Sequence, residues 1–233
     1  MDSSRPPRTA RRFICAGIAL ALGVAPSSLR AKEVAVDVGH YREAPGVISA
    51  SGVPEFEFNK ALAFRVREFL EAAGLRVRMI GEQGDYADLY ARTLAARGAD
   101  LFVSIHHDSV QERYLKVAER FAGFSLFVSR TNPHVAKSLV CASAIGAAMR
   151  RAGLTPSLYH ADPVLGEDRP FADAENGVHY FDNLAVAKRA TMPALLVEAG
   201  VIVNREEEAR LAQPAVQASV ANAIAQGVTQ CLQ

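Results

Sequence analysis

Four residues in the 233-residue sequence combine side chains suited to metal binding or acid–base chemistry with positions next to predicted strands or helices. His40 follows the apolar segment VAVDVG, His106 follows LFVSI, and Glu198 follows ALLV. Ligands of open α/β sheets bind outside the carboxyl ends of strands, so we expect residues just beyond these ends to converge. Glu55 lies in the first turn of a predicted helix, close to His40 in the chain and across a loop rich in Gly, Pro and Ser.

Two imidazoles and a carboxylate are a common ligand set for catalytic zinc, with the fourth position open for water. His40, Glu55 and His106 offer this set, and zinc lowers the pKa of such a water and polarises a carbonyl. Glu198, unbound to metal, would take the water proton and pass it to a leaving amine. Each residue alone is also compatible with a structural role, such as a loop histidine, a helix N-terminal acid or a salt-bridge partner. His107 adjoins His106 and is expected to point the other way.

Apolar segments of strand length alternate with segments of helical spacing, which predicts a single-domain α/β fold with a mostly parallel mixed sheet flanked by helices. The segment from Thr155 to Gly177 shows little periodicity and is predicted to be a loop. A loop of this length suits a lid or a partner site, and a surface excursion is the alternative. The predicted strands are 34–38, 75–80, 101–105, 124–128 and 194–197, and the predicted helices are 54–73, 88–97, 133–152, 206–211 and 214–232.

Residues 1–31 have the organisation of a signal peptide, with four arginines before an apolar run from 13 to 25 and small residues up to Ala31. The run is short for a membrane span, which needs about 20 residues, and an uncleaved anchor helix is the alternative. Arg11 and Arg12 are compatible with the twin-arginine route, and the general secretory route is equally compatible. We therefore expect a catalytic domain at 32–233 with no membrane span in the mature form.

Removal of residues 1–31 would change the formal net charge from +1 to −3. Nucleic-acid binders usually carry a basic face or stripe, so the charge argues against nucleic acid as a partner. Cys141 and Cys231 remain after the leader, and an oxidising compartment permits a disulfide between them. Two buried free thiols are equally compatible with the sequence.

Four motifs, in this order, resemble the zinc-dependent N-acetylmuramoyl-L-alanine amidase family, amidase type 3: VAVDVGH, PEFEFN, ADLFVSIHHDS and MPALLVEAGVIVN. The resemblance runs from about Val34 to the C-terminus. It implies a mixed sheet flanked by helices, a zinc ion, and cleavage of the amide between the muramic acid lactyl group and L-alanine of the stem peptide. It also implies peptidoglycan as the substrate and an exported enzyme of the periplasm or cell wall.

The resemblance also implies roles for single residues. His40 and His106 match the family's zinc-binding histidines, and Glu198 matches its catalytic glutamate. Glu55 precedes Asn59 by four residues, as the metal-binding glutamate does in the family, and this spacing favours Glu55 over its rival Glu57.

The sequence departs from the family pattern without losing a matched ligand or the catalytic glutamate. Three further polar residues, His160, Asp162 and His179, match no family role and are expected to be surface or loop residues. The departures are Tyr41-Arg42 in place of a Gly pair, Ile80-Gly81 in place of Thr-Arg, Asp108 where Asn is common, and Val201 where Phe is usual.

Two alternatives to the muramoyl amidase remain open at this stage. One is another zinc amidohydrolase or a peptidase acting on stem peptides, which loop shape rather than the metal set would distinguish. The other is a catalytically inactive wall-binding protein on the same scaffold. The sequence does not identify a regulatory protein.

Overall fold

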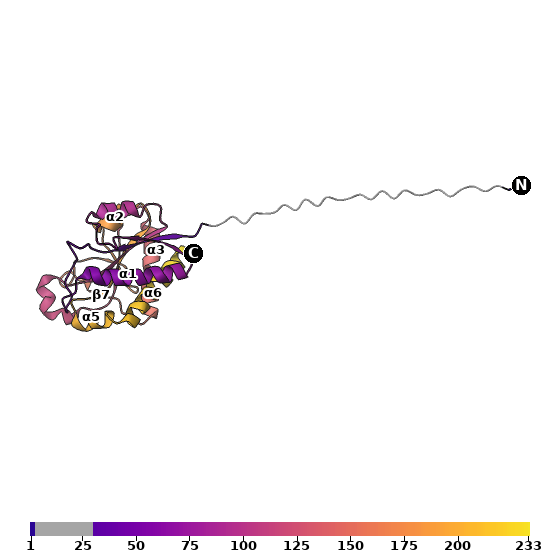
Figure 1. Ribbon diagram of the computed structural model, residues 1–233. Helices are drawn as coiled ribbons and strands as arrows, with labels where there is room; N and C mark the ends of the chain where they lie inside the picture. Colours follow the sequence, from indigo (N-terminus) through magenta and orange to yellow (C-terminus); the bar gives the residue numbers. More distant parts are fainter. Residues whose placement is uncertain (3–29) are drawn as a thin grey trace. The chain divides into compact units, whose positions relative to one another are not determined.

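The computed structural model describes residues 1–2 and 30–233, and a seven-stranded sheet organises the second range (Figure 1). The strands are β1 (Glu33–Val38), β2 (Arg76–Ile80), β3 (Leu101–Asp108), β4 (Ser125–Val128), β5 (Phe171–Asp173), β6 (Val178–Tyr180) and β7 (Ala194–Val201). Their order in the sheet is β2-β1-β3-β7-β4-β6-β5. The β4–β7 and β5–β6 pairs are antiparallel and the other pairs are parallel. The predicted fold class, a mostly parallel mixed sheet flanked by helices, is confirmed.

Helices cover both faces of this sheet. The α-helices are α1 (Glu55–Ala72), α2 (Leu89–Ala95), α3 (Val135–Arg151), α4 (Ala185–Arg189), α5 (Arg205–Leu211) and α6 (Pro214–Leu232), and the 3₁₀ segments are η1 (Glu112–Arg120) and η2 (Tyr159–Ala161). Within the described residues, no helix combines the length and the apolar character that crossing a membrane requires. The predicted leader at 1–31 lies almost entirely outside the described residues.

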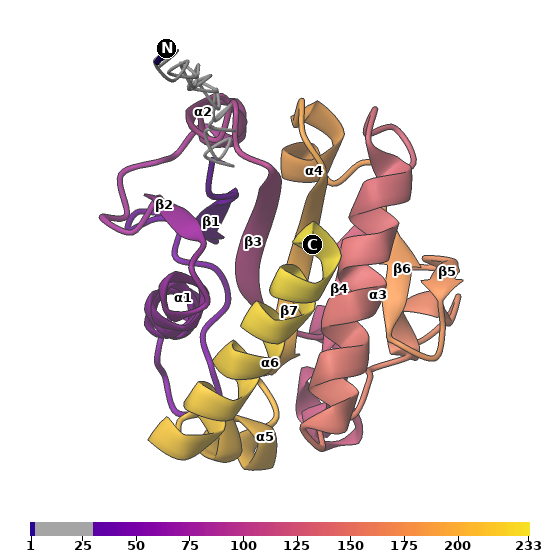
Figure 2. The same ribbon diagram turned by 90° about the vertical axis from the view of Figure 1, so that its right-hand side faces the viewer.

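Alternation along the strands divides their side chains between two cores. Val36 and Val103 face the larger core, which α1, α3 and α6 complete. Figure 2 shows α3 and α6 in front of the sheet and α1 end-on near β1 and β2. Ala35 and Phe102, one residue earlier on each strand, face a smaller core closed by α2 and α4. Successive side chains of a strand point to opposite faces, so the second face also carries His106 of β3.

Two predicted strands are longer than expected, which corrects the placement of two candidate site residues. Strand β3 continues to Asp108 and β7 to Val201, so His106 and Glu198 lie inside strands and not beyond their ends. The apolar pattern stops at Ile105 and Val197, but backbone pairing between β3 and β7 does not depend on side-chain polarity and continues.

The predicted loop from Thr155 to Gly177 contains regular structure that was not predicted. It holds η2 and β5, and β6 follows directly. Segments of three residues are too short for a periodicity to be recognised. Helix α4 and the segment η1 were likewise not predicted.

A disulfide between Cys141 and Cys231 joins α3 to α6, with the two Cα atoms 5.0 Å apart. The bridge spans 90 residues of sequence, so it removes substantial loop entropy from the unfolded chain. We expect the Cys141→Ala, Cys231→Ala double variant to lose about 2–5 kcal/mol of unfolding free energy. Urea denaturation of the variant beside the wild type, with and without reductant, measures this loss. Equal stability of the wild type in both conditions would show that the bridge does not form.

Candidate metal centre and active site

His40, Glu55 and His106 converge at the carboxyl edge of β1 and β3. The Nε2 atom of His40 lies 2.9 Å from Oε2 of Glu55, and Nδ1 of His106 lies 3.0 Å from Oε1. One ligand atom from each residue fits within 4.8 Å of the other two. Within residues 1–2 and 30–233, these three side chains form the one group of His, Cys, Asp or Glu with the geometry to hold a metal ion. The structure therefore brings together the three residues that the sequence singled out.

Glu55 is held in place at the first turn of α1. Its Oε1 accepts a hydrogen bond from Nδ2 of Asn59 at 3.1 Å, and its Oε2 accepts one from the Val47 amide at 3.3 Å. Burial raises the pKa of the Glu55 carboxyl, but hydrogen bonds from His106 and His40 outweigh burial, and the pKa is lowered. The carboxylate is thus ionised, the form that binds metal. Glu57 is exposed, two residues further along the helix.

The backbone of His40 has a left-handed conformation, with φ of 68°, which is unfavourable for a residue with a side chain. Arg92 of α2, which is almost fully buried, holds this turn: its Nη2 donates to the His40 carbonyl, and its Nη1 pairs with Asp37 of β1 at 2.7 Å. Gly39 is required beside it, because a Cβ at that position would collide with the His106 ring. The role of Arg92 could not be predicted from local sequence, since its contacts to β1 span more than 50 residues.

Glu198 of β7 stands directly beside His106 of β3 in parallel register, so both side chains lie on the same face of the sheet. Its Oε2 atom is buried and has no hydrogen-bond partner among the described residues. Burial raises the pKa of the Glu198 carboxyl well above its usual value, and the charges of Asp108 and Glu55 raise it further. A carboxyl with a raised pKa and a free acceptor atom, next to a candidate metal site, is suited to exchanging protons with a substrate or water.

Comparison with known proteins identifies the family of the chain. The family model for N-acetylmuramoyl-L-alanine amidase matches residues 34–230. The chain belongs to this family. AmiA of Escherichia coli K12 is 27% identical over 218 residues, which cover 84% of this chain and 74% of that protein. AmiC of Neisseria meningitidis is 29% identical over 84% of this chain, which spans 51% of that longer protein.

Solved structures of other amidases have the same fold as this enzyme. The catalytic domain of CwlV, an N-acetylmuramoyl-L-alanine amidase from Bacillus (Paenibacillus) polymyxa, is 28% identical. It superposes with a TM-score of 0.68 over 86% of this chain and 98% of that domain. The amidase Ami1 of Mycobacterium smegmatis has the same fold, with a TM-score of 0.71 over 86% of this chain and 96% of that one, at 22% identity.

A pocket of about 260 Å³ opens beside the two histidines. Apart from His40, His106 and the Asp37–Arg92 pair, the residues that line the pocket are largely apolar. The apolar lining residues include Leu89, Leu184, Val186 and Leu196. This pocket places a preformed apolar surface directly next to the candidate metal centre.

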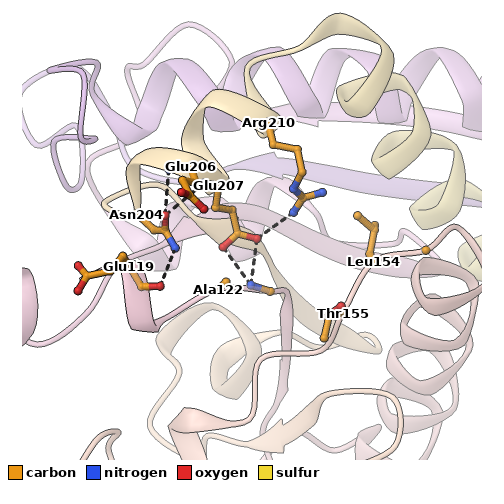
Figure 3. A pocket seen from close by; sticks show the side chains of 10 residues that line it. Glu119, Ala122, Leu154, Thr155, Asn204, Glu206, Glu207 and Arg210 are labelled. Atoms are coloured by element: carbon orange, nitrogen blue, oxygen red, sulfur yellow. Dashed lines mark hydrogen bonds and ion pairs between the residues drawn. The ribbon is translucent and has the colours of Figure 1, made fainter. Parts of the chain in front are cut away.

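A larger pocket of about 650 Å³ lies elsewhere and contains none of the candidate site residues (Figure 3). The charged side chains that line it make structural hydrogen bonds and ion pairs within the protein. Glu207 accepts hydrogen bonds from the Gly123 amide at 2.9 and 3.0 Å and pairs with Arg210, and Asn204 caps α5. Size alone therefore does not mark the active site of the enzyme.

His160 and His179 are not surface residues, which corrects the expectation from the sequence. His160 lies in η2 and His179 in β6, and both are buried. Nε2 of His160 lies 2.8 Å from Oδ2 of Asp108, two residues after His106. Asp162 is a loop residue as expected, and its carboxylate accepts hydrogen bonds from the Val164 and Leu165 amides.

Proposed function

We propose that the enzyme uses a zinc ion held by His40, Glu55 and His106 to hydrolyse the amide between N-acetylmuramic acid and L-alanine in peptidoglycan. The observation that carries this proposal is the position of Glu198, whose unpartnered Oε2 lies on the same face as His106, in a chain of the amidase family. The alternatives, a stem-peptide peptidase and an inactive wall-binding protein, find no specific support in the site.

The residues fit a zinc ion by their chemistry. Two imidazole nitrogens and an ionised carboxylate oxygen form one of the usual three-residue sets of catalytic zinc. Asn59 orients Glu55, and Arg92 fixes the turn that carries His40, as outer-shell partners do in metal sites. When bound, zinc supplies Lewis acidity toward the amide carbonyl and a water molecule of lowered pKa.

Glu198 moves the proton in this proposal. Its Oε2 accepts a proton from the attacking water and then delivers it to the leaving nitrogen of L-alanine. Its raised pKa brings proton affinity closer to the working pH, where a general acid–base is most effective.

The test is the identity of the bond cut in purified peptidoglycan. The proposal expects release of intact stem peptides that begin with L-alanine, identified by mass spectrometry, together with about one zinc ion per chain as expected for a single three-ligand site. A stem-peptide peptidase would release peptide fragments instead. Sedimentation with peptidoglycan and no released peptide would indicate a wall-binding protein.

We further propose that residues 1–31 are a removed leader and that residues 32–233 act in the periplasm or cell wall. The arginine-rich start, the short apolar run and the disulfide between Cys141 and Cys231 support export to an oxidising compartment. The intact mass of the exported protein tests this, since a full-length mass in the soluble cytoplasm would contradict it. A regulatory protein remains unidentified.

A further inference from the structure

The segment between α3 and β6 makes hydrogen bonds and an ion pair with residues at the end of β3, next to the candidate active site. Oη of Tyr159 lies 2.6 Å from both Oδ2 of Asp108 and the Ser109 carbonyl oxygen, either of which can accept its hydrogen bond. His160 lies between two carboxylates, with Nε2 2.8 Å from Asp108 and Nδ1 2.8 Å from Glu167. The segment is therefore a fixed wall beside the site.

Two cationic side chains of this wall, His160 and Arg169, share one carboxylate, that of Glu167. Burial lowers the pKa of His160, but its hydrogen bonds to Asp108 and Glu167 outweigh burial and raise the pKa to about 9. His160 is thus charged at neutral pH and is the closest partner of Glu167. Arg169 shares Glu167 only at the longer distance of 3.5 Å.

The guanidinium of Arg169 lies on aromatic rings. Its Cζ is 3.7 Å from the centroid of the Phe181 ring and 5.0 Å from that of Phe127. Cation–π contacts of this kind hold a guanidinium in one place while leaving its N–H edge available for an anion. The Arg169 side chain keeps 22% of its surface exposed, so an anion in solution can reach it.

Strand register places Arg169 beside the candidate active site. Phe127 of β4 stands opposite Leu196 of β7, two residues before Glu198 and on the same face. Leu196 also lines the pocket that contains His40 and His106. The positive charge of Arg169 is close enough to lower the pKa of Glu198, although burial and the neighbouring carboxylates dominate.

We propose that Arg169 binds a carboxylate on the stem peptide of the substrate. This inference rests on the proposed function and adds the orientation of the substrate, that is, which side of the site the stem peptide occupies. The carboxyl group of muramic acid is consumed in the scissile amide, so the nearest negative charges of the substrate belong to the peptide. The peptide then extends over β4 and β6 toward Arg169, and the glycan side lies toward the apolar pocket near α2 and α4.

A pair of soluble muropeptides that differ in one group tests this. Both carry the same disaccharide and stem peptide, and the second residue of the stem bears a free carboxylate in one and a carboxamide in the other. The wild type should show a lower KM for the carboxylate form. Arg169→Gln should raise that KM about 10- to 100-fold, the usual effect of losing a charge-assisted pair, while the KM for the carboxamide form stays unchanged. Arg169→Lys, which keeps the charge without the planar fork, should fall between them.

Arg130→Gln is the matched control. Arg130 also lies over a ring, that of Tyr180, and also pairs with a carboxylate, that of Asp182. Tyr180 packs against the core on the α3 side of the sheet, away from the Glu198 face. This variant should leave both KM values unchanged.

Equal effects of Arg169→Gln on both muropeptides would show a structural role and overturn the inference, as would a wild type that does not distinguish them. Calorimetric titration with the two free stem peptides gives the same comparison without turnover. Absence of cleavage by the wild type would count against the proposed function. Tighter binding of the carboxylate peptide, lost in Arg169→Gln, would still support the role of Arg169.

Discussion

Glu198→Gln should lower kcat by about 10²–10⁴-fold while zinc content stays at the wild-type level, because a positioned acid–base group contributes this much and the change removes only the proton acceptor. The amide has nearly the same shape as the carboxylate, so KM should change little. The variant should be at least as stable as the wild type. Burial and the charges of Asp108 and Glu55 disfavour the ionised Glu198, and a neutral amide avoids this repulsion.

Glu206→Gln is the matched control for this variant, because it makes the same chemical change at an exposed carboxylate of α5. Its turnover and zinc content should both equal those of the wild type. Near-normal turnover in Glu198→Gln would mean that another group transfers the proton. Loss of zinc in Glu198→Gln would mean that Glu198 is itself a ligand, and the roles would have to be reassigned.

The sequence predicted the convergence of the site more reliably than the local structure around it. His40, His106 and Glu198 were expected to meet because each follows a predicted strand, and ligands bind outside the carboxyl ends of strands in an open α/β sheet. In the structure, β1, β3 and β7 are parallel neighbours, so these ends share one edge. Strand directions alone are enough for this prediction. The error in strand length does not affect it, because extending β3 and β7 by a few residues keeps His106 and Glu198 at the same edge.

Contacts between distant segments could not be predicted, because no local pattern encodes them. The disulfide joins residues 90 positions apart, and Asp108 meets His160 across 52. Both histidines of the wall, His160 and His179, were expected in loops or on the surface, since an isolated histidine in a polar stretch gives no sign of burial. Phe127 packs against both rings, and the carboxylates of Asp108 and Glu167 flank His160, contacts that only the assembled sheet creates.

Arg92 illustrates a different limit of sequence reasoning. A fully buried arginine in a short helix is unusual, and the sequence around it predicts only a helix over 88–97. Its function follows from the left-handed turn at His40, whose carbonyl needs a donor in the interior. The sequence is enough to identify His40 as a candidate ligand. The role of Arg92, which orients the turn at His40, depends on the backbone conformation.

The second large effect concerns the metal ligands. His40→Ala, Glu55→Ala and His106→Ala should each lower zinc affinity by more than the roughly 10- to 100-fold typical of losing an outer-shell partner, because catalytic zinc usually has only three protein ligands. Zinc content after dialysis against a weak chelator measures this directly, and activity should fall in parallel. Circular dichroism checks that each variant is folded. Glu55→Gln, which keeps an acceptor for the Val47 amide, provides a second variant should Glu55→Ala unfold.

Glu57→Ala is the control that tests the helix register. Glu57 lies two residues after Glu55 on the same helix, carries the same charge and is exposed, whereas Glu55 is 3% exposed and touches both histidines. Its removal should leave zinc content and turnover at wild-type levels. If Glu57→Ala empties the site and Glu55→Ala does not, the metal-binding carboxylate has been assigned to the wrong residue of the first turn of α1. If all four variants retain zinc, the ion binds elsewhere, and the hydrogen bonds between Glu55 and the two histidines have a structural role.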